Sequence, residues 1–161
     1  MSSLTNCLLE ESRAISNAAE KLNNEEVEKA LNLLSKCSKS GDKLVITGVG
    51  KSGIVARKIA ATFSSVGLMA IYLNPLDALH GDLGIVSSKD ICLLLSNSGE
   101  TEELKAILPH LKRRNTARIA IVGITPEKGL ETYEKLLPRM AINWPEATFD
   151  VYGWNQKFLK N

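Results

Sequence analysis

Residues 43–53 read KLVITGVGKSG, and this stretch decides the fold class. The segment Lys43 to Thr47 is a short, largely apolar run, which is typical of a strand buried inside a parallel sheet. Gly48 to Gly53 follow as a glycine-rich turn, and after it come a helical pattern and a second apolar segment, Leu68 to Leu73. We therefore expect a strand, a turn, a helix and a strand in succession.

A second unit of the same kind follows further along the chain. Its strand is Ile91 to Leu95, and its helix carries an apolar stripe from Leu104 to Leu111 and ends in basic residues. Ala117 to Val122 provide a further strand. Alternating strands and helices at this spacing predict right-handed crossovers and a parallel sheet of four to five strands with helices on both faces.

The segments before and after these units differ in pattern. Apolar residues recur at helical spacing from Leu4 to Leu22, and a second helix is expected to be capped by Asn24 and to stop at Gly41. After Ile124 the strand and helix rhythm is lost. Residues 126–140 are expected to form a helix and residues 147–152 a strand.

The composition is that of an average globular domain. The 161 residues are 44% hydrophobic and 24% charged, and the formal net charge is +2 with scattered basic residues, so nucleic acid is not an expected partner. No stretch is long and apolar enough to span a membrane, and we expect a cytoplasmic protein. The three cysteines are Cys7, Cys37 and Cys92. Because they are odd in number and far apart in the sequence, we expect reduced thiols and no metal site.

The glycine turn suits an anion. Its glycines allow close approach of the backbone, and the N–H groups of the following helix point outward. The turn also matches a dinucleotide fingerprint, but the acidic residue expected at the end of the second strand is replaced by Leu73-Asn74-Pro75, which disfavours NAD. A Walker A loop would need a glycine at the position that Val45 occupies, so the turn is not a Walker A loop.

The turn after the third strand reads SNSGET, from Ser96 to Thr101. Hydroxyl groups and helix N–H groups together suit the oxygens of a phosphate, although Ser98 is also explained as a helix-capping residue. Acidic residues stabilise the first turn of a helix, and one of them, Glu103, is our candidate for a proton-transfer base. Both turns follow parallel strands, so we expect them at the same edge of the sheet.

A longer segment, Asn74 to Gly84, follows the second strand and contains His80-Gly81-Asp82. We expect a long loop there, and long loops in small domains are often functional. His80 is a candidate acid or base because its side chain titrates near neutral pH, and an ordinary surface histidine is the alternative.

Four motifs together resemble the sugar isomerase (SIS) domain family, and most closely its arabinose-5-phosphate isomerase branch. They are GVGKSG, RKIAATFSSVG, LHGDLG and SNSGET, in that order. The resemblance covers Leu4 to Gly123, and it implies a flavodoxin-like three-layer αβα sandwich. It divides the chain into an SIS domain, residues 1–124, and a divergent tail, residues 125–161, which lacks the later strand, helix and histidine of similar domains.

The resemblance also implies site roles. In this branch Lys51, His80 and Glu103 occupy positions associated with catalysis. The resemblance implies that four hydroxyl side chains bind the phosphate: Ser52, Ser96, Ser98 and Thr101. Two neighbouring loop residues, Gly50 and Asn97, complete the predicted phosphate site.

The implied reaction exchanges ribulose 5-phosphate and arabinose 5-phosphate through a cis-enediol, in the supply of the Kdo sugar of lipopolysaccharide. No metal or cofactor is needed, and similar proteins are usually homotetramers whose neighbouring subunits complete each site. A catalytically silent phosphosugar-binding domain is the alternative, because the late histidine is absent.

Overall fold

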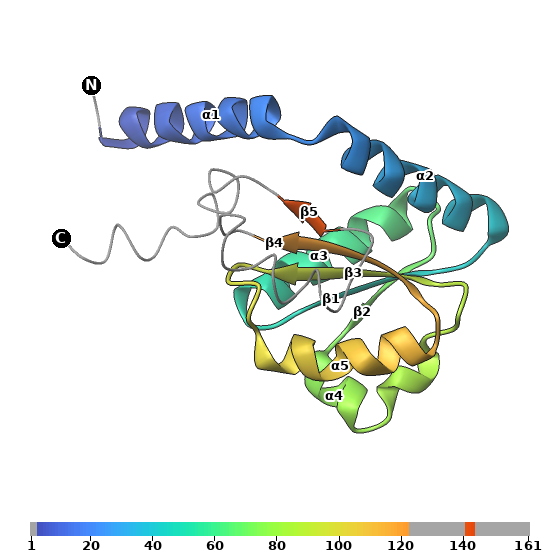
Figure 1. Cartoon of the computed structure of the whole chain (residues 1–161). Coiled ribbons are helices and arrows are strands. Elements are labelled where there is room, and N and C mark those ends of the chain that lie inside the picture. The colour runs from blue at the N-terminus through green and yellow to red at the C-terminus, as the bar shows by residue number, and fades with distance from the viewer. Residues whose placement is uncertain (1–2, 123–140, 144–161) are drawn as a thin grey trace.

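Five strands of the computed structural model, which describes residues 3–122 and 141–143, make one parallel sheet. The strands are β1 (Leu44–Gly48), β2 (Ala70–Leu73), β3 (Ile91–Ser96), β4 (Ala117–Val122) and β5 (Ala141–Asn143). Their order across the sheet is β2-β1-β3-β4-β5, with β1 and β3 at its centre (Figure 1). This is the flavodoxin-like order, and the predicted α/β class is confirmed.

Helices cover both faces of the sheet, as predicted. On one face lie α4 (Pro75–Leu79) and α5 (Glu102–Arg113), and on the other lie α2 (Asn24–Ser40) and α3 (Lys51–Ser65) (Figure 1). Each face has its own apolar core, because alternate side chains of a strand point to opposite sides. All six residues of β3 are buried, which explains the unbroken apolar run of its sequence.

The N-terminal helices are α1 (Ser3–Lys21) and α2. Gly41 ends α2 with a φ of 74°, as predicted, but the predicted N-cap was wrong by one residue. Asn23, not Asn24, is the N-cap, because the Asn23 side-chain oxygen accepts hydrogen bonds from the N–H groups of Glu25 and Glu26. The apolar stripe of α1 is mostly exposed, and Figure 1 shows this helix extending away from the sheet.

The segment after β2 is not the long loop that the sequence predicted. It folds into the short helix α4 and a 3₁₀ helix, η1 (Asp82–Ile85). The side-chain oxygen of Asn74 accepts from the N–H of Leu76, and Pro75 occupies the first turn, where its missing N–H costs nothing. Leu83 and Val86 pack in the same apolar core as the buried residues of α5, and this packing holds the segment against the sheet.

An ion pair joins β1 and β3 where they begin. The Lys43 ammonium lies 2.6 Å from Asp90, whose side chain is almost fully buried. Asp90 also accepts from the backbone N–H groups of Lys43, at 3.1 Å, and Ser87, at 2.7 Å. Burial alone would raise the pKa of Asp90, but these hydrogen bonds hold it below its usual value. The amino ends of the central strands are thus tied together.

Part of the tail joins the sheet. β5 pairs in parallel with β4, with Ile142 opposite Ile121, and the sequence did not predict this three-residue strand. The helix predicted at residues 126–140 and the strand predicted at residues 147–152 lie outside the described residues.

Candidate functional site

The two predicted loops meet at one edge of the sheet. Gly48, the last residue of β1, pairs with Leu95 of β3, so the chain leaves both strands at the same level. Since β1 and β3 are parallel neighbours, the glycine turn and the serine loop begin side by side. The expectation that these loops share one edge is confirmed, and this edge is the carboxyl edge of the sheet, where ligands of such sheets bind.

The three glycines of the first turn have different roles. Gly50 is the N-cap of α3, with a φ of 58° that side chains rarely adopt, and nothing lies within 4 Å of the position where a Cβ would stand. A Cβ on Gly53, in contrast, would lie 2.7 Å from the carbonyl oxygen of Gly48. Gly50 therefore exposes the backbone at the N-terminus of α3, whereas Gly48 and Gly53 let α3 approach β1.

Tyr72 supports the glycine turn from the neighbouring strand, and no pattern in the sequence pointed to it. Its hydroxyl donates a hydrogen bond to the carbonyl oxygen of Gly48 at 3.0 Å. The guanidinium of Arg57 lies over the Tyr72 ring, 4.6 Å from its centre, and holds the ring by a cation–π contact. These contacts join β2, α3 and the end of β1, which fixes the turn before any ligand binds.

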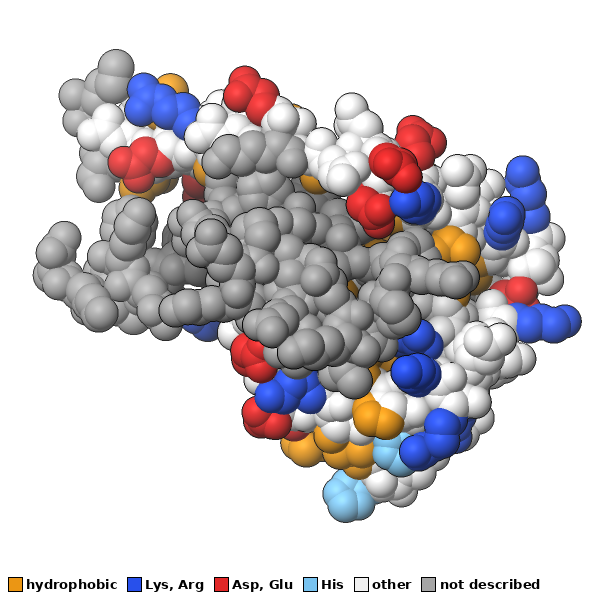
Figure 2. Space-filling view, in the orientation of Figure 1, with side chains coloured by type: hydrophobic (Ala, Val, Ile, Leu, Met, Phe, Trp, Pro, Cys, Tyr) orange, Lys and Arg blue, Asp and Glu red, His pale blue; other side chains and the backbone are white. Residues whose placement is uncertain are grey.

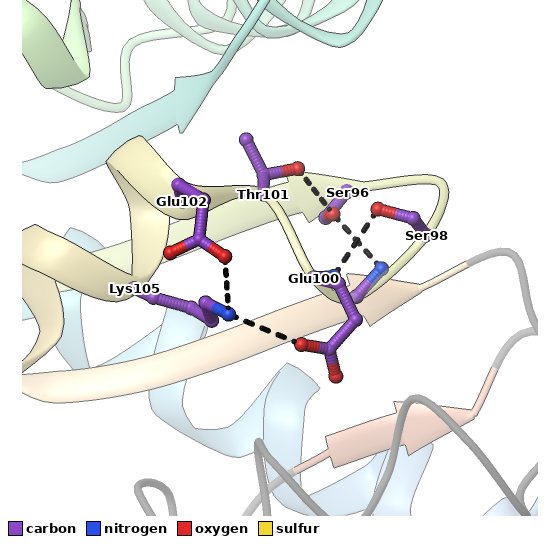
Figure 3. A network of polar contacts seen from close by, with 7 residues as sticks. Ser96, Ser98, Glu100, Thr101, Glu102 and Lys105 are labelled. Atoms are coloured by element: carbon purple, nitrogen blue, oxygen red, sulfur yellow. Dashed lines mark hydrogen bonds and ion pairs between the residues drawn. The ribbon is translucent and has the colours of Figure 1, made fainter.

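The serine loop is held by its own side chains (Figure 3). The buried Ser96 hydroxyl accepts from the N–H of Gly99 at 3.0 Å and shares a hydrogen bond with the Thr101 hydroxyl at 2.8 Å. Ser98 accepts from the N–H of Glu100 at 3.1 Å. Thr101 is the N-cap residue of α5, but its side chain bonds Ser96 instead of capping the helix.

This arrangement bears on the capping alternative for Ser98. The hydroxyl closes a turn within the loop and is not the side-chain cap of α5, because its partner, Glu100, precedes the helix. No side chain caps α5 in the described part of the chain, so its first turn keeps the partial positive charge of a helix N-terminus. An anion at this position would be stabilised.

Lys105 balances the acidic residues beside the serine loop. Its ammonium lies 2.6 Å from the Glu102 carboxylate and 3.3 Å from that of Glu100 (Figure 3). Hydrogen bonds to Glu102 and then Glu100 raise the pKa of Lys105, which stays protonated. Two carboxylates that would repel a phosphate are therefore paired with a cation.

The predicted phosphate ligands lie in these two loops. Gly50 and Ser52 belong to the start of α3, with the Ser52 side chain half-buried. Asn97 and Ser98 are exposed, while Ser96 is buried and already engaged within the loop. Their contact with a ligand stays a prediction, since the structure shows their positions alone.

The predicted catalytic residues are only partly brought together. Lys51 is exposed in the first turn of α3, and Glu103 is half-buried in the first turn of α5, so both lie near the carboxyl edge. His80 is exposed at the C-terminal end of α4, outside the two loops. Within residues 3–122 and 141–143, none of the three forms a hydrogen bond or an ion pair through its side chain.

Thr47 is a residue at this edge that the sequence did not single out. It is 1% exposed, and its hydroxyl oxygen has no hydrogen-bond partner among the described residues. An apolar strand with one threonine gives no hint of this, because the pairing of a hydroxyl depends on tertiary contacts.

Comparison with known proteins decides the family. Residues 37–134, more than half of the chain, match the SIS domain family. The chain belongs to this family. The two loops described above, and the sheet edge that they share, are therefore those of an SIS domain.

Two curated relatives of this SIS domain are arabinose 5-phosphate isomerases. KpsF of Escherichia coli O6:H1 is 37% identical over 123 residues, which are 76% of this chain and 37% of KpsF. KdsD of Shigella flexneri is 46% identical over 88 residues, 55% of this chain and 26% of KdsD. The chain thus spans between a quarter and two fifths of the length of these relatives.

Solved structures agree with the fold of this SIS domain. An E. coli CFT073 protein in complex with arabinose 5-phosphate is 32% identical, with a TM-score of 0.71 over 90% of this chain and 76% of its own. Phosphoheptose isomerase GmhA from Neisseria gonorrhoeae, 18% identical, has a TM-score of 0.70 over 92% of this chain and 91% of its own and shows the shared fold.

The structure offers no sign of other site chemistry in the residues it describes. No group of three or more His, Cys, Asp or Glu side chains there is placed to hold a metal ion. None of the helices in that part is long and apolar enough to cross a membrane.

Basic and acidic side chains are interspersed on the face in Figure 2. The three cysteines are free, and burial raises the pKa of Cys92 to about 12.

Proposed function

We propose that this SIS domain is a sugar-phosphate isomerase that exchanges D-ribulose 5-phosphate and D-arabinose 5-phosphate. The observation that carries the proposal is the meeting of the glycine turn and the serine loop at the carboxyl ends of β1 and β3. The similarity to arabinose 5-phosphate isomerases, and to a structure in complex with arabinose 5-phosphate, supports this choice of sugar.

In the proposed complex the phosphate lies between the two helix N-termini. The N–H groups at the start of α3 and α5 and the hydroxyls of Ser52, Ser98 and Thr101 surround its oxygens. Partial charges at two helix ends favour a dianion more than a neutral sugar. Gly50 and Asn97 contribute backbone surface, and Ser96 keeps the loop in shape.

The proposed chemistry needs one base and one site for negative charge. Glu103 removes a proton from C1 of the ketose while O2 gains a proton, which gives a cis-enediol. Return of a proton to C2, with loss of the O1 proton, gives the aldose, so atoms and electrons balance without a metal or cofactor. Lys51 stabilises the developing negative charge, and His80 transfers protons between oxygens or opens the sugar ring.

His80 follows α4 and belongs to neither loop, and the proposal includes assembly of subunits. In a homo-oligomer, a dimer or a tetramer, His80 of one subunit would complete the site of another. We also propose that the protein is cytoplasmic and serves the supply of the Kdo sugar, as the resemblance to the arabinose-5-phosphate isomerase branch implies.

The second candidate is a silent phosphosugar-binding domain. One observation favours it: among the described residues the side chains of Lys51, His80 and Glu103 form no hydrogen bond or ion pair with one another, and His80 belongs to neither loop. The test incubates the 161-residue chain with ribulose 5-phosphate and follows formation of arabinose 5-phosphate by NMR. Turnover supports the isomerase, and thermal stabilisation by the sugar phosphate without turnover selects the binding domain. If the chain shows no turnover and no thermal stabilisation, both candidates are contradicted.

A further inference from the structure

Thr47 presents a buried hydroxyl at the carboxyl edge, and this hydroxyl has no partner in the part of the chain that the structure describes. It is the residue before Gly48 in β1, and it is 1% exposed. Its oxygen has no hydrogen-bond partner in the described residues. Buried hydroxyls nearly always have partners, because losing water without a new hydrogen bond is unfavourable. An exception in a ligand-binding region therefore requires a reason.

The register shows which side of the sheet the hydroxyl faces. Thr47 pairs with Leu73 and Leu94, and both belong to the apolar core beneath α4 and α5. Ser96 lies two residues after Leu94 and so points to the same face. Strand spacing and rise place the Cα atoms of Thr47 and Ser96 about 8 Å apart. Thr47 thus lies beside the serine loop, one strand away from it.

Shape alone does not explain a threonine at this position. Valine has the same branched shape and would fill the space without a buried unpaired oxygen. Another buried threonine, next to the same sheet, shows the usual arrangement. Thr116, 2% exposed and adjoining β4 at the opposite edge, donates a hydrogen bond of 3.4 Å to the carbonyl oxygen of Ser87.

We propose that Thr47 is a sugar-binding residue whose hydroxyl finds its partner when the site is filled. The partner is an oxygen of the bound sugar, contacted directly or through one enclosed water. The phosphate lies between the N-termini of α3 and α5, and Thr47, about 8 Å from Ser96 on the same face of the sheet, is close enough to meet the sugar that the phosphate carries. Because the hydroxyl is covered in the empty protein, binding shifts the edge loops slightly outward. This inference rests on the proposed phosphosugar site.

The test is Thr47→Val in the 161-residue chain, with arabinose 5-phosphate and inorganic phosphate as probes. Removing an unpaired hydroxyl should raise the melting temperature of the empty protein by about 2–5 °C. Calorimetry should show the Kd for arabinose 5-phosphate weakened about three- to tenfold, with that for inorganic phosphate unchanged. Thr47→Ser, which keeps the hydroxyl, should bind arabinose 5-phosphate within about twofold of wild type.

Thr116→Val is the matched control. It removes a hydroxyl that already has a partner, so its melting temperature should not rise, and its affinity for arabinose 5-phosphate should equal that of wild type.

Three results with the Thr47→Val variant would overturn the inference alone. Undiminished binding of arabinose 5-phosphate by Thr47→Val would show that the hydroxyl has no role in binding. Equal weakening for inorganic phosphate would assign it to the phosphate and not to the sugar. A lower melting temperature of the empty variant would show that the hydroxyl already has a partner. Failure of the wild type to bind arabinose 5-phosphate would overturn the proposed function, and this inference with it.

Discussion

The two edges of the sheet treat their polar groups differently. At the amino edge, Asp90 accepts three hydrogen bonds, from the side chain and backbone of Lys43 and from the backbone of Ser87. At the carboxyl edge, the Thr47 hydroxyl is buried and unpaired among the described residues. Both residues lie at ends of the same two strands, β1 and β3. The type of strand therefore does not explain why, within the described residues, Asp90 is paired and Thr47 is not.

The difference indicates a division of roles. Polar groups at the amino edge satisfy one another and stabilise the fold, since a buried carboxylate must be paired. At the carboxyl edge Thr47 lacks a partner among the described residues, and the N-termini of α3 and α5 have no side-chain cap there, so these groups can meet a ligand. Substitutions at the first edge should therefore change stability, and substitutions at the second should change binding or turnover.

The largest effect is expected at the carboxyl edge. Glu103→Gln should lower turnover of ribulose 5-phosphate by about 10²- to 10⁴-fold, because an amide cannot accept the substrate proton. Affinity and melting temperature should change little. The measurement is NMR of product formation and of solvent exchange at the substrate C1. Glu26→Gln, also half-buried in the first turn of a helix, is the control. Retained exchange in Glu103→Gln would require another base.

At the amino edge, Asp90→Asn should lower the free energy of unfolding by about 2–3 kcal/mol, since Lys43 loses its partner and the hydrogen bonds lose their charge. Urea unfolding measures this change. Asp77→Asn, at an exposed position on α4, should change stability by less than about 0.5 kcal/mol. Binding of arabinose 5-phosphate should be the same in all three proteins. An Asp90 variant as stable as wild type would remove the structural role of this edge.

The same ion pair predicts an acid dependence. The pKa of Asp90 is lower in the folded protein, so the folded state binds fewer protons than the unfolded state. Its stabilisation is fully present above the unfolded value of about 3.9 and is lost as the pH falls through the folded pKa. Urea midpoints at pH 7, 4 and 3 should therefore converge for wild type and Asp90→Asn. A gap that stays constant would contradict this assignment.

The smallest effect concerns charge beside the serine loop. Lys105→Met leaves Glu100 and Glu102 without this cation, and should weaken arabinose 5-phosphate binding about two- to fivefold in low salt and less in high salt. Lys29 offers a matched control, because it joins Glu25 at 2.8 Å and Glu26 at 3.0 Å in α2. Lys29→Met should leave the Kd unchanged. Equal effects of both variants would show no local role for Lys105.

Local sequence signals predicted most of the fold. The apolar run before Gly48 predicted a buried central strand, and Gly41 correctly marked the end of α2. The Asn74-Pro75 pair was a readable helix start that a long-loop interpretation overlooked. β5 was missed because three residues are too few to show a periodic pattern. Its pairing with β4 also joins residues about 20 positions apart, which local patterns do not reveal.

The candidate site was predictable in its loops but not in its supports. Glycines and hydroxyl residues after parallel strands predicted that both loops lie at the carboxyl edge, and the strand register confirms this position. Tyr72, which holds the glycine turn through Gly48, acts across two strands that are distant in sequence. Whether Thr47 is paired likewise depends on neighbours that only the folded chain brings together.

The most direct test is a titration of the ¹⁵N-labelled chain with arabinose 5-phosphate, followed by amide NMR. The backbone signals of residues 50–53 and 99–101 should shift together with one Kd, while those of residues 87–90 at the amino edge stay in place. Shifts confined to a single loop, or centred on the amino edge, would contradict a single phosphosugar site built from both loops.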